Sequence, residues 1–231
     1  LCFRSPRRAR PTGDDRGPME KARMNVTTIH PATPSIAEAG APPTSAAWAA
    51  AFAAALPYRA FLERHGTPEQ RDRWEAVYAR AALDDAQRAL LATFVRRMPV
   101  IVLAGAWCGD CVNQCPIFAR FAEAAPAIDL RYLDRDALPE IAAHLRICGG
   151  QRVPTVAFFS EDFTPVLFYG DRTLSAYRTA AAAQLGATCS TGIAVPAPDA
   201  LAAASHDWLE QFERVQLILR LSGRLRQLHG D

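Results

Sequence analysis

The sequence has no long hydrophobic run that could cross a membrane. Its longest uncharged stretch near the N-terminus, residues 39–58, is rich in alanine and interrupted by prolines, whereas a transmembrane helix needs about 20 predominantly apolar residues. No basic cluster lies directly before this stretch, as one does in an export signal. We therefore expect no membrane association and a cytoplasmic location.

An excess of charge of one sign is also missing. The net charge is +2, and residues 1–24 contain seven basic and three acidic side chains, which gives 7 − 3 = +4 for that segment alone. The remainder therefore carries +2 − 4 = −2. A folded part so close to neutral gives no electrostatic reason to expect a nucleic-acid partner.

Complete metal and phosphate motifs are absent as well. The Gly149-Gly150 pair lacks the other residues of a phosphate-binding loop, and the five histidines have no ligand spacing with one another. No internal repeat is visible. These absences leave the six cysteines, at positions 2, 108, 111, 115, 148 and 189, as the main chemical feature of the chain.

Composition and periodicity divide the chain into four segments. Residues 1–43 are rich in Pro, Thr, Ala, Gly and Arg without an apolar period, which predicts a disordered tail. Residues 44–97 have helical periodicity and predict an N-terminal helical extension. Residues 98–187 predict a domain of alternating strands and helices, and residues 188–231 predict a linker followed by an amphipathic C-terminal helix.

Apolar positions three and four residues apart predict which helix faces are buried. In the N-terminal extension these positions are Trp74, Val77, Tyr78, Ala81, Leu90, Leu91, Phe94 and Val95. In the C-terminal helix they are Trp208, Phe212, Val215 and Leu219, with Leu221, Leu225 and Leu228 extending the stripe. This last stripe can pack on its own chain or on a second copy, and packing within the chain is the more common arrangement.

From residue 98 onward the pattern reads strand, helix, strand, helix, strand, strand, helix. The run "MPVIVLAGAW" is typical of a strand buried on both faces. The second helix is expected over residues 137–147, ending before two glycines. Only four residues separate the last two strands, which predicts an antiparallel hairpin. The fold class is therefore α/β, with a mixed sheet and helices on both faces.

Three cysteines follow the first of these strands within eight positions. The spacing places Cys108 at the beginning of a helix, where free N–H groups and the helix dipole stabilise a thiolate. Cys111 lies one turn further on the same face, close enough to form a disulfide with Cys108. Such a pair can exchange disulfides with a partner, although zinc sites use the same spacing.

The segment "WCGDC" (residues 107–111) resembles the Trp-Cys-Gly-Pro-Cys centre of thioredoxin, with Asp110 in place of the proline. Pro116 matches the proline that kinks the family's active-site helix, and "RVPT" (residues 152–155) resembles the loop that carries its cis-proline. Gly170, at the end of the last strand, also fits. The resemblance covers residues 98–187.

The resemblance implies a thioredoxin fold, a mixed central sheet flanked by helices, to which this chain adds N-terminal helices and a C-terminal helix. It implies that Cys108 is the exposed nucleophile and Cys111 the buried resolving thiol of a disulfide oxidoreductase that reduces protein or small-molecule disulfides. The residues implied to form the substrate groove are Trp107, Gly109, Asp110, Val153 and a cis Pro154. Such a catalyst needs no bound cofactor, and its electrons come from a reductase or a small thiol.

The sequence departs from the family at two features of this site. The buried aspartate that assists the second thiol in thioredoxin is replaced by Val102, so the proton route must differ and could involve Asp134, Asp136 or water. The carboxylate of Asp110 should repel a neighbouring thiolate and raise the pKa of Cys108, which favours a reducing centre.

Two further thiols leave alternatives open. Cys115 lies on the same helix face as Cys111 and is either an auxiliary thiol, a metal ligand or a small buried side chain. Cys148 precedes the Pro154 loop and could join a second disulfide or a four-cysteine metal site. The alternatives to an enzyme are accordingly a non-catalytic redox-sensing or partner-binding module and a cysteine-rich metal-binding protein.

Overall fold

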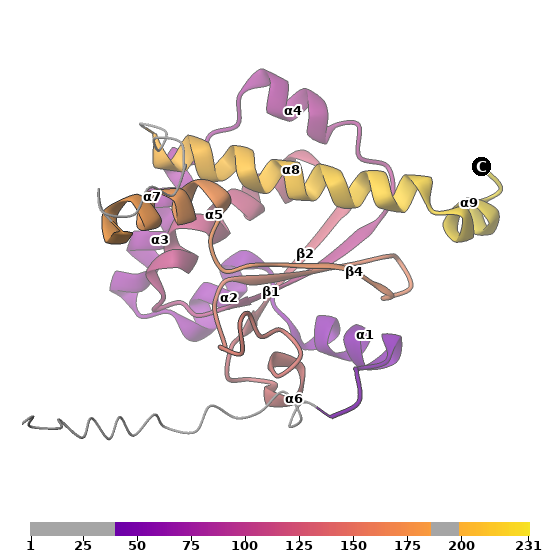
Figure 1. Cartoon of the computed structure of the whole chain (residues 1–231), viewed down its shortest axis with the longest axis horizontal. Helices are drawn as coiled ribbons and strands as arrows, with labels where there is room; N and C mark the ends of the chain where they lie inside the picture. Colours follow the sequence, from indigo (N-terminus) through magenta and orange to yellow (C-terminus); the bar gives the residue numbers. More distant parts are fainter. Residues whose placement is uncertain (1–39, 186–198) are drawn as a thin grey trace, which may run out of the picture. The chain divides into compact units, whose positions relative to one another are not determined.

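The computed structural model describes residues 40–185 and 199–231, and the strands in this part of the chain form one sheet (Figure 1). The strands are β1 (Met98–Ala104), β2 (Ile128–Asp134), β3 (Thr155–Phe159) and β4 (Pro165–Gly170), in the spatial order β2-β1-β3-β4. β1 is parallel to β2, and β3 is antiparallel to both β1 and β4. The predicted mixed sheet and its terminal hairpin are confirmed.

The helices of the described segments surround this sheet. In chain order they are α1 (Ser45–Ala54), α2 (Tyr58–His65), α3 (Pro68–Arg80), α4 (Asp85–Leu91), α5 (Gly109–Ala124), α6 (Pro139–Ala142), α7 (Leu174–Leu185), α8 (Ala200–Leu221) and α9 (Gly223–His229). The element order predicted from residue 98 onward is confirmed. Most of the predicted tail, the linker residues 188–198, Cys2 and Cys189 lie outside the described residues.

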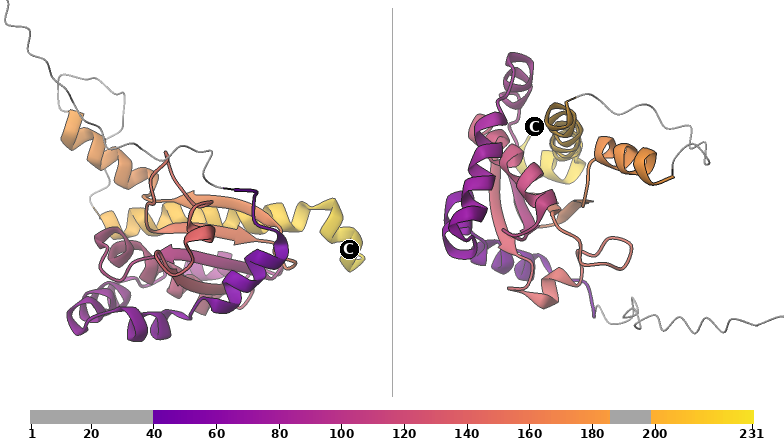
Figure 2. Two further views of the ribbon diagram at one scale, coloured as in Figure 1. Left: turned by 90° about the horizontal axis from the view of Figure 1, so that it is seen from below. Right: turned by 90° about the vertical axis from the view of Figure 1, so that its left-hand side faces the viewer.

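Successive side chains of β3 pack against helices on opposite faces of the sheet, as the period of two in a strand requires. The ring of Phe158 lies 5.0 Å from that of Phe212 in α8, and the ring of Phe159 lies 5.1 Å from that of Trp48 in α1. The strands therefore lie between α8 and α1 (Figures 1 and 2). All seven residues of β1 are buried, which explains its unbroken apolar sequence.

The N-terminal helices also protect one edge of the sheet. Leu56, between α1 and α2, exchanges two backbone hydrogen bonds with Tyr132 of β2, with N···O distances of 2.8 and 2.7 Å. An uncovered edge strand would offer these groups to another chain. None of the helices in the described residues combines the length and hydropathy that a membrane span requires.

The prediction that Val95 faces the core is wrong. Helix α4 ends at Leu91, and Val95 is 67% exposed. The helix stops because the hydroxyl and backbone N–H of Thr93 both donate to the carbonyl of Leu90 in a tight turn. The Gln216 side chain of α8 then accepts from the N–H groups of Val95 and the next residue, which directs the chain into β1.

The predicted second helix of the domain is shorter than expected. Helix α6 covers only Pro139–Ala142, and the chain then turns instead of continuing to residue 147. Ile147 and Gly150 form an isolated bridge, and between them Cys148 and Gly149 have positive φ angles of 50° and 75°. This tight turn brings the chain back toward Pro154.

The C-terminal stripe is confirmed in its first part and wrong in its second. Its first four members, Trp208, Phe212, Val215 and Leu219, are buried against the sheet and α5, so this stripe packs within the chain. Leu225 is also buried, but Leu221 and Leu228 are 76% and 65% exposed. Leu221 follows Leu219 by only two residues, which places it on a different face of the helix.

Gly170 is required where β4 ends, because its φ is +154° and a Cβ there would lie 2.4 Å from the carbonyl oxygen of Pro154. We expect Gly170→Ala to lower the free energy of unfolding by roughly 2–4 kcal/mol, since backbone atoms cannot move away cheaply. Urea denaturation measures this value. The matched control is Gly223→Ala, where the added Cβ meets no atom within 4 Å; an equal loss in the control would contradict this account.

Candidate active site

Cys108 lies at the junction between β1 and α5. β1 ends at Ala104, and a turn closed by the hydrogen bond from Cys108 N to Gly105 O, at 3.0 Å, brings Cys108 to the N-cap of α5. Its side chain is half-buried. The first turn of a helix presents unpaired N–H groups to a side chain in this position. The sequence-based placement of this sulfur is therefore confirmed.

Trp107 is half exposed beside Cys108 and is held from two sides. A Cβ on Gly105 would lie 2.7 Å from the indole, so glycine allows the ring to lie against the backbone. The guanidinium carbon of Arg135 lies 4.7 Å from the ring centroid, a cation–π distance. The indole thus has a defined position at the rim of the site.

The loop before β3 lies directly against the Cys108 sulfur. The Val153–Pro154 peptide is cis, as the resemblance implied. The Cys108 Sγ lies 3.5 Å from the Val153 carbonyl oxygen and donates to it. Gly170 at the end of β4 lets that strand lie directly against the backbone of Pro154, because it has no Cβ. The structure therefore brings the predicted nucleophile Cys108 and its neighbour Trp107 next to the predicted groove residues Val153 and Pro154, which come from a separate segment of the chain.

Cys111 and Cys115 lie deeper in the same helix and are inaccessible to solvent. Burial raises the pKa of the Cys111 thiol, and the neighbouring Cys115 thiol adds to the increase. The backbone carbonyl of Cys115 accepts a hydrogen bond of 2.8 Å from the Tyr132 hydroxyl. Pro116 follows inside the helix, where it cannot donate a backbone hydrogen bond.

Opposing interactions act on the Cys108 thiol. The neighbouring Cys111 thiol and the partial burial of Cys108 raise its pKa, while the backbone N–H groups of Cys111 and Asp110 lower it, and the balance is upward. A raised pKa leaves a smaller fraction of thiolate at neutral pH. The backbone N–H groups at the helix start therefore act on the Cys108 pKa in the expected direction, but the interactions that raise it outweigh them in the dithiol form.

The charge of Asp110, which was predicted to raise the pKa of Cys108, is not what raises it. The Asp110 Oδ2 atom lies 3.0 Å from Nε of Arg172, in the loop after β4. This ion pair offsets the negative charge beside Cys108. The Asp110 carboxylate accordingly does not figure among the main causes that raise the Cys108 pKa.

The two aspartates considered for proton transfer are engaged elsewhere. Asp136 pairs with Arg135 at 3.0 Å, and Asp134 lies 3.8 Å from His65. Val102, at the position of the family's buried aspartate, is completely buried. On the neighbouring strand, the phenol of Tyr132 lies beside helix α5 and donates to the Cys115 carbonyl. Burial raises the pKa of this phenol.

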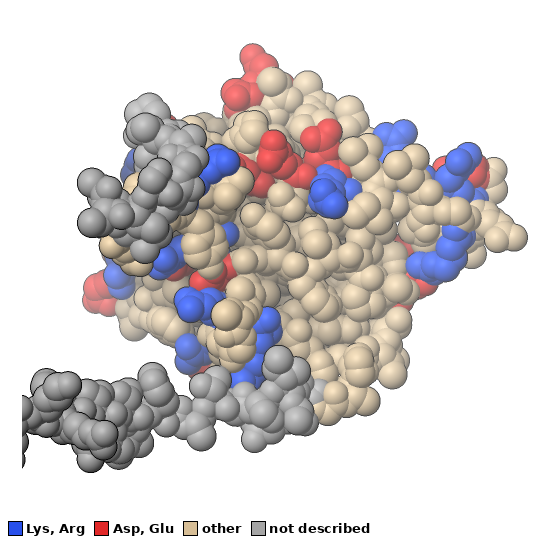
Figure 3. Space-filling view, viewed as in Figure 1, with Lys and Arg blue, Asp and Glu red and all other residues tan. Residues whose placement is uncertain are grey.

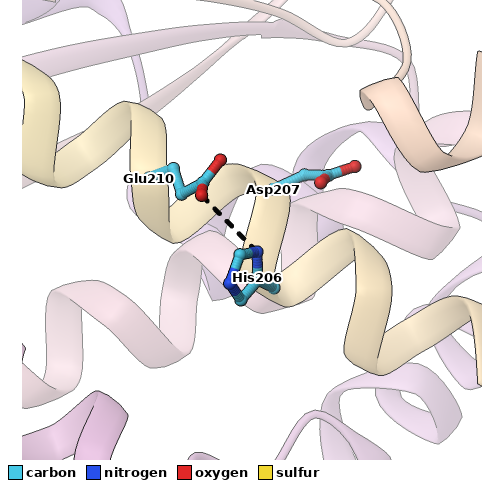
Figure 4. A group of neighbouring side chains, drawn as sticks. All are labelled: His206, Asp207 and Glu210. Atoms are coloured by element: carbon cyan, nitrogen blue, oxygen red, sulfur yellow. Dashed lines mark ion pairs between the residues drawn. The ribbon is translucent and has the colours of Figure 1, made fainter.

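The cysteines do not form a compact metal site in the described part of the chain. Cys148 is exposed, and no three cysteine sulfurs among the described residues lie within 4.8 Å of one another. The group that meets this spacing is His206, Asp207 and Glu210 on α8 (Figure 4). It lies near the surface, and Asp207 already accepts from the N–H of Ser175 at 2.7 Å, so nothing further indicates an ion there.

Sequence reasoning missed two tryptophans that position the site through hydrogen bonds. Trp74 of α3 donates from Nε1 to the carbonyl of Ala106 at 2.9 Å, which anchors the active-site turn. Trp208 of α8 donates to Gln114 of α5 at 2.7 Å, and Gln114 donates to the Asp171 carbonyl at 3.0 Å. The available signal was the indole N–H, which usually finds a partner when buried.

A second missed group lies in the loop after β4. The carboxylate of Asp171 is buried, accepts a hydrogen bond from the Tyr177 hydroxyl, and lies 3.4 Å from Nη1 of Arg152. Arg152 directly precedes the cis-proline segment. The loop after β4 is therefore tied to the Val153–Pro154 loop on one side and to α5 on the other.

Comparisons with known proteins agree with this geometry. A family model described as Thioredoxin matches residues 56–184, which includes α2 to α4 as well as the sheet. A protein of unknown function from Pseudomonas aeruginosa is 21% identical with a TM-score of 0.51, and the match covers 78% of this chain and 98% of that one. An HIV epitope-scaffold protein is 20% identical with a TM-score of 0.53, covering 72% and 97%.

A third solved structure, thioredoxin O2 from Arabidopsis thaliana in its oxidized state, is 18% identical and matches at a TM-score of only 0.29, over 42% of this chain and 85% of that one. No curated protein matches the sequence. The two similarities with TM-scores above 0.5 indicate a shared fold and nothing about activity.

The Asp110–Arg172 pair generates a test of the site's electrostatics. Arg172→Ala should uncover the Asp110 charge, raise the Cys108 pKa further and slow alkylation of Cys108 by iodoacetamide at pH 8 about two- to tenfold. Peptide mass spectrometry follows Cys108 separately from the other thiols. The added substitution Asp110→Asn should restore the rate, and a rate that stays low in the double variant would contradict this assignment.

Proposed function

The chain belongs to the thioredoxin family, and from this premise we propose that it is a thiol–disulfide oxidoreductase that uses Cys108 and Cys111 to reduce disulfides. The observation that carries the proposal is the half-buried Cys108 sulfur, 3.5 Å from the Val153 carbonyl and one helical turn before a fully buried second thiol. An accessible sulfur next to a protected one is what a two-step exchange requires.

In the first step the Cys108 thiolate attacks one sulfur of the substrate disulfide. A mixed disulfide forms with Cys108, and the other substrate sulfur leaves as a thiolate and takes up a proton. In the second step Cys111 loses its proton and attacks the Cys108 sulfur, which releases the second substrate thiol. The substrate gains two electrons, and the protein is left with a Cys108–Cys111 disulfide that an external thiol or reductase must reduce.

The residues around Cys108 have proposed roles in binding. Trp107 forms an apolar wall, and the Val153 backbone beside Pro154 offers hydrogen bonds to an extended substrate segment. Gly109 leaves open space, since a Cβ there would meet no atom within 4 Å. Asp110, neutralised by Arg172, avoids a strong local charge that would repel the attacking thiolate.

The buried state of Cys111 favours a reducing direction. Because burial raises the pKa of Cys111, this thiol stays protonated at neutral pH until a substrate binds. The substrate is a protein or a small molecule with an accessible disulfide. We place this activity in the cytoplasm, where external thiols are kept reduced. The proposal requires no resident cofactor.

Two candidates for auxiliary thiols remain outside the proposed exchange. Cys115 is buried beside Cys111, and Cys148 is exposed on the turn before the groove loop. Neither position favours a four-cysteine metal site, because the described sulfurs are too dispersed. The alternative of a non-catalytic redox-sensing module differs from the enzyme in turnover, and the following experiment separates the two.

We expect the wild type to catalyse reduction of insulin and of a small aromatic disulfide by dithiothreitol, and Cys108→Ser to lower both rates to the uncatalysed background. The matched control is Cys148→Ser, which removes an exposed thiol outside the groove and should keep the wild-type rate. A wild type that forms the Cys108–Cys111 disulfide yet turns over neither substrate would support the sensor and contradict the enzyme.

The order of the two steps makes a separate prediction. Cys111→Ser should arrest the reaction after the first step, so that a mixed disulfide between Cys108 and a substrate thiol accumulates and is detected as an added mass. Cys108→Ser should form no such adduct in the groove. Adducts that map to Cys111 in the Cys108→Ser variant would reverse the assigned roles.

A further inference from the structure

Helix α8 has a second apolar face that residues 40–185 and 199–231 leave uncovered. One face is buried against the sheet and α5, as described above. On the outer face Leu217, Ile218 and Leu221 are 47%, 42% and 76% exposed. A helix of a monomeric domain normally presents polar residues on its outer face.

These side chains belong to a continuous surface. Leu217 and Leu221 line a shallow groove of about 880 Å³ along α8 and also a neighbouring hollow that contains Val95. We call Val95, Leu217, Ile218 and Leu221 the α8 patch. Single exposed apolar residues are common, but contiguous patches rimmed by polar groups mark interaction sites.

Charges of opposite sign lie at the two ends of the α8 patch. On the N-terminal side, Asp207, Glu210, Glu213 and Arg214 sum to −3 + 1 = −2. On the C-terminal side, Arg224 pairs with Asp162 and Arg96 pairs with Asp231, while Arg220 and Arg226 add two further positive charges, which gives +4 − 2 = +2. Figure 3 shows mainly acidic groups, with a basic group beside them, over the middle of α8, and mainly basic groups toward α9, with an uncharged surface between them.

We propose that the α8 patch is the interface of a homodimer in which α8 packs antiparallel on α8 of a second copy. A two-fold axis near Leu217 brings the acidic end of each helix to the basic end of the other, so the same surface is complementary to itself. Leu217, Ile218 and Leu221 then cover their counterparts. Residues 1–24 of the chain are another candidate for covering the patch, but their net charge of +4 is complementary only to its acidic end. A second copy is complementary to both ends and is therefore the proposed occupant.

The size of the proposed α8 interface determines the affinity that we expect for the dimer. A helix of 22 residues is about 33 Å long, and a specific interface buries about 800 Å² on each partner. The α8 patch consists of only four apolar side chains, so an interface of that size must also include polar residues of α8 and α9 around the patch. We therefore expect a dimer with a dissociation constant in the micromolar range, with monomers present at low concentration.

Sedimentation of the full chain with excess dithiothreitol tests the proposal, because the reductant prevents intermolecular disulfides. The mass should rise from 25.2 kDa toward twice that value as the concentration increases to about 100 µM. Leu221→Glu should remain monomeric. The matched control is Leu174→Glu on α7, which changes another half-exposed leucine and should leave dimerisation intact.

A charge exchange tests the antiparallel arrangement. Glu213→Arg should weaken the dimer about tenfold, and adding Arg220→Glu in the same chain should restore most of the affinity. Circular dichroism confirms that each variant is folded. A wild type that stays monomeric at the highest concentration, a Leu221→Glu variant that still dimerises, or a charge exchange that restores nothing would overturn the proposal.

Discussion

The contact between the Cys108 sulfur and the Val153 carbonyl is the interaction on which the site depends. It joins two segments that are 45 residues apart in the chain, one at the end of β1 and the other before β3. The contact exists because β1 and β3 are antiparallel neighbours and Gly170 lets the backbone behind Pro154 come close. Any change that separates these two loops also breaks the contact between the Cys108 sulfur and the cis-proline segment.

The helices outside the minimal fold support this contact from both sides. On one side Trp74 of α3 holds the Ala106 carbonyl, next to the cysteine turn. On the other side Trp208 of α8 holds Gln114, which in turn holds the loop after β4. Buried hydrogen bonds of this kind cost free energy when one partner is lost. The additional helices therefore position the turn that carries Cys108 as well as covering the sheet.

The fold after residue 98 could be predicted because its signals are local. A continuous apolar run, a helix that begins at Cys108 and a four-residue connection each depend on neighbours in sequence. The errors have the same origin, because local periodicity was extended too far. Val95 lies beyond the end of α4, and Leu221 lies on a different face of α8 from the buried stripe. The Asp110–Arg172 pair joins residues 62 positions apart, and no local pattern indicates it. It could not be foreseen, and it changes the electrostatic account of the site.

The central claim is that residues 108 and 111 form one reversible disulfide of reducing character. The most direct test equilibrates the protein with glutathione buffers, quenches with acid and follows the tryptic peptide of residues 98–120, which contains three of the cysteines. The account predicts one two-electron transition between Cys108 and Cys111, with Cys115 reduced throughout and a potential nearer to about −270 mV than to about −120 mV. A potential near the upper value, or a disulfide that never links these two residues, would contradict it.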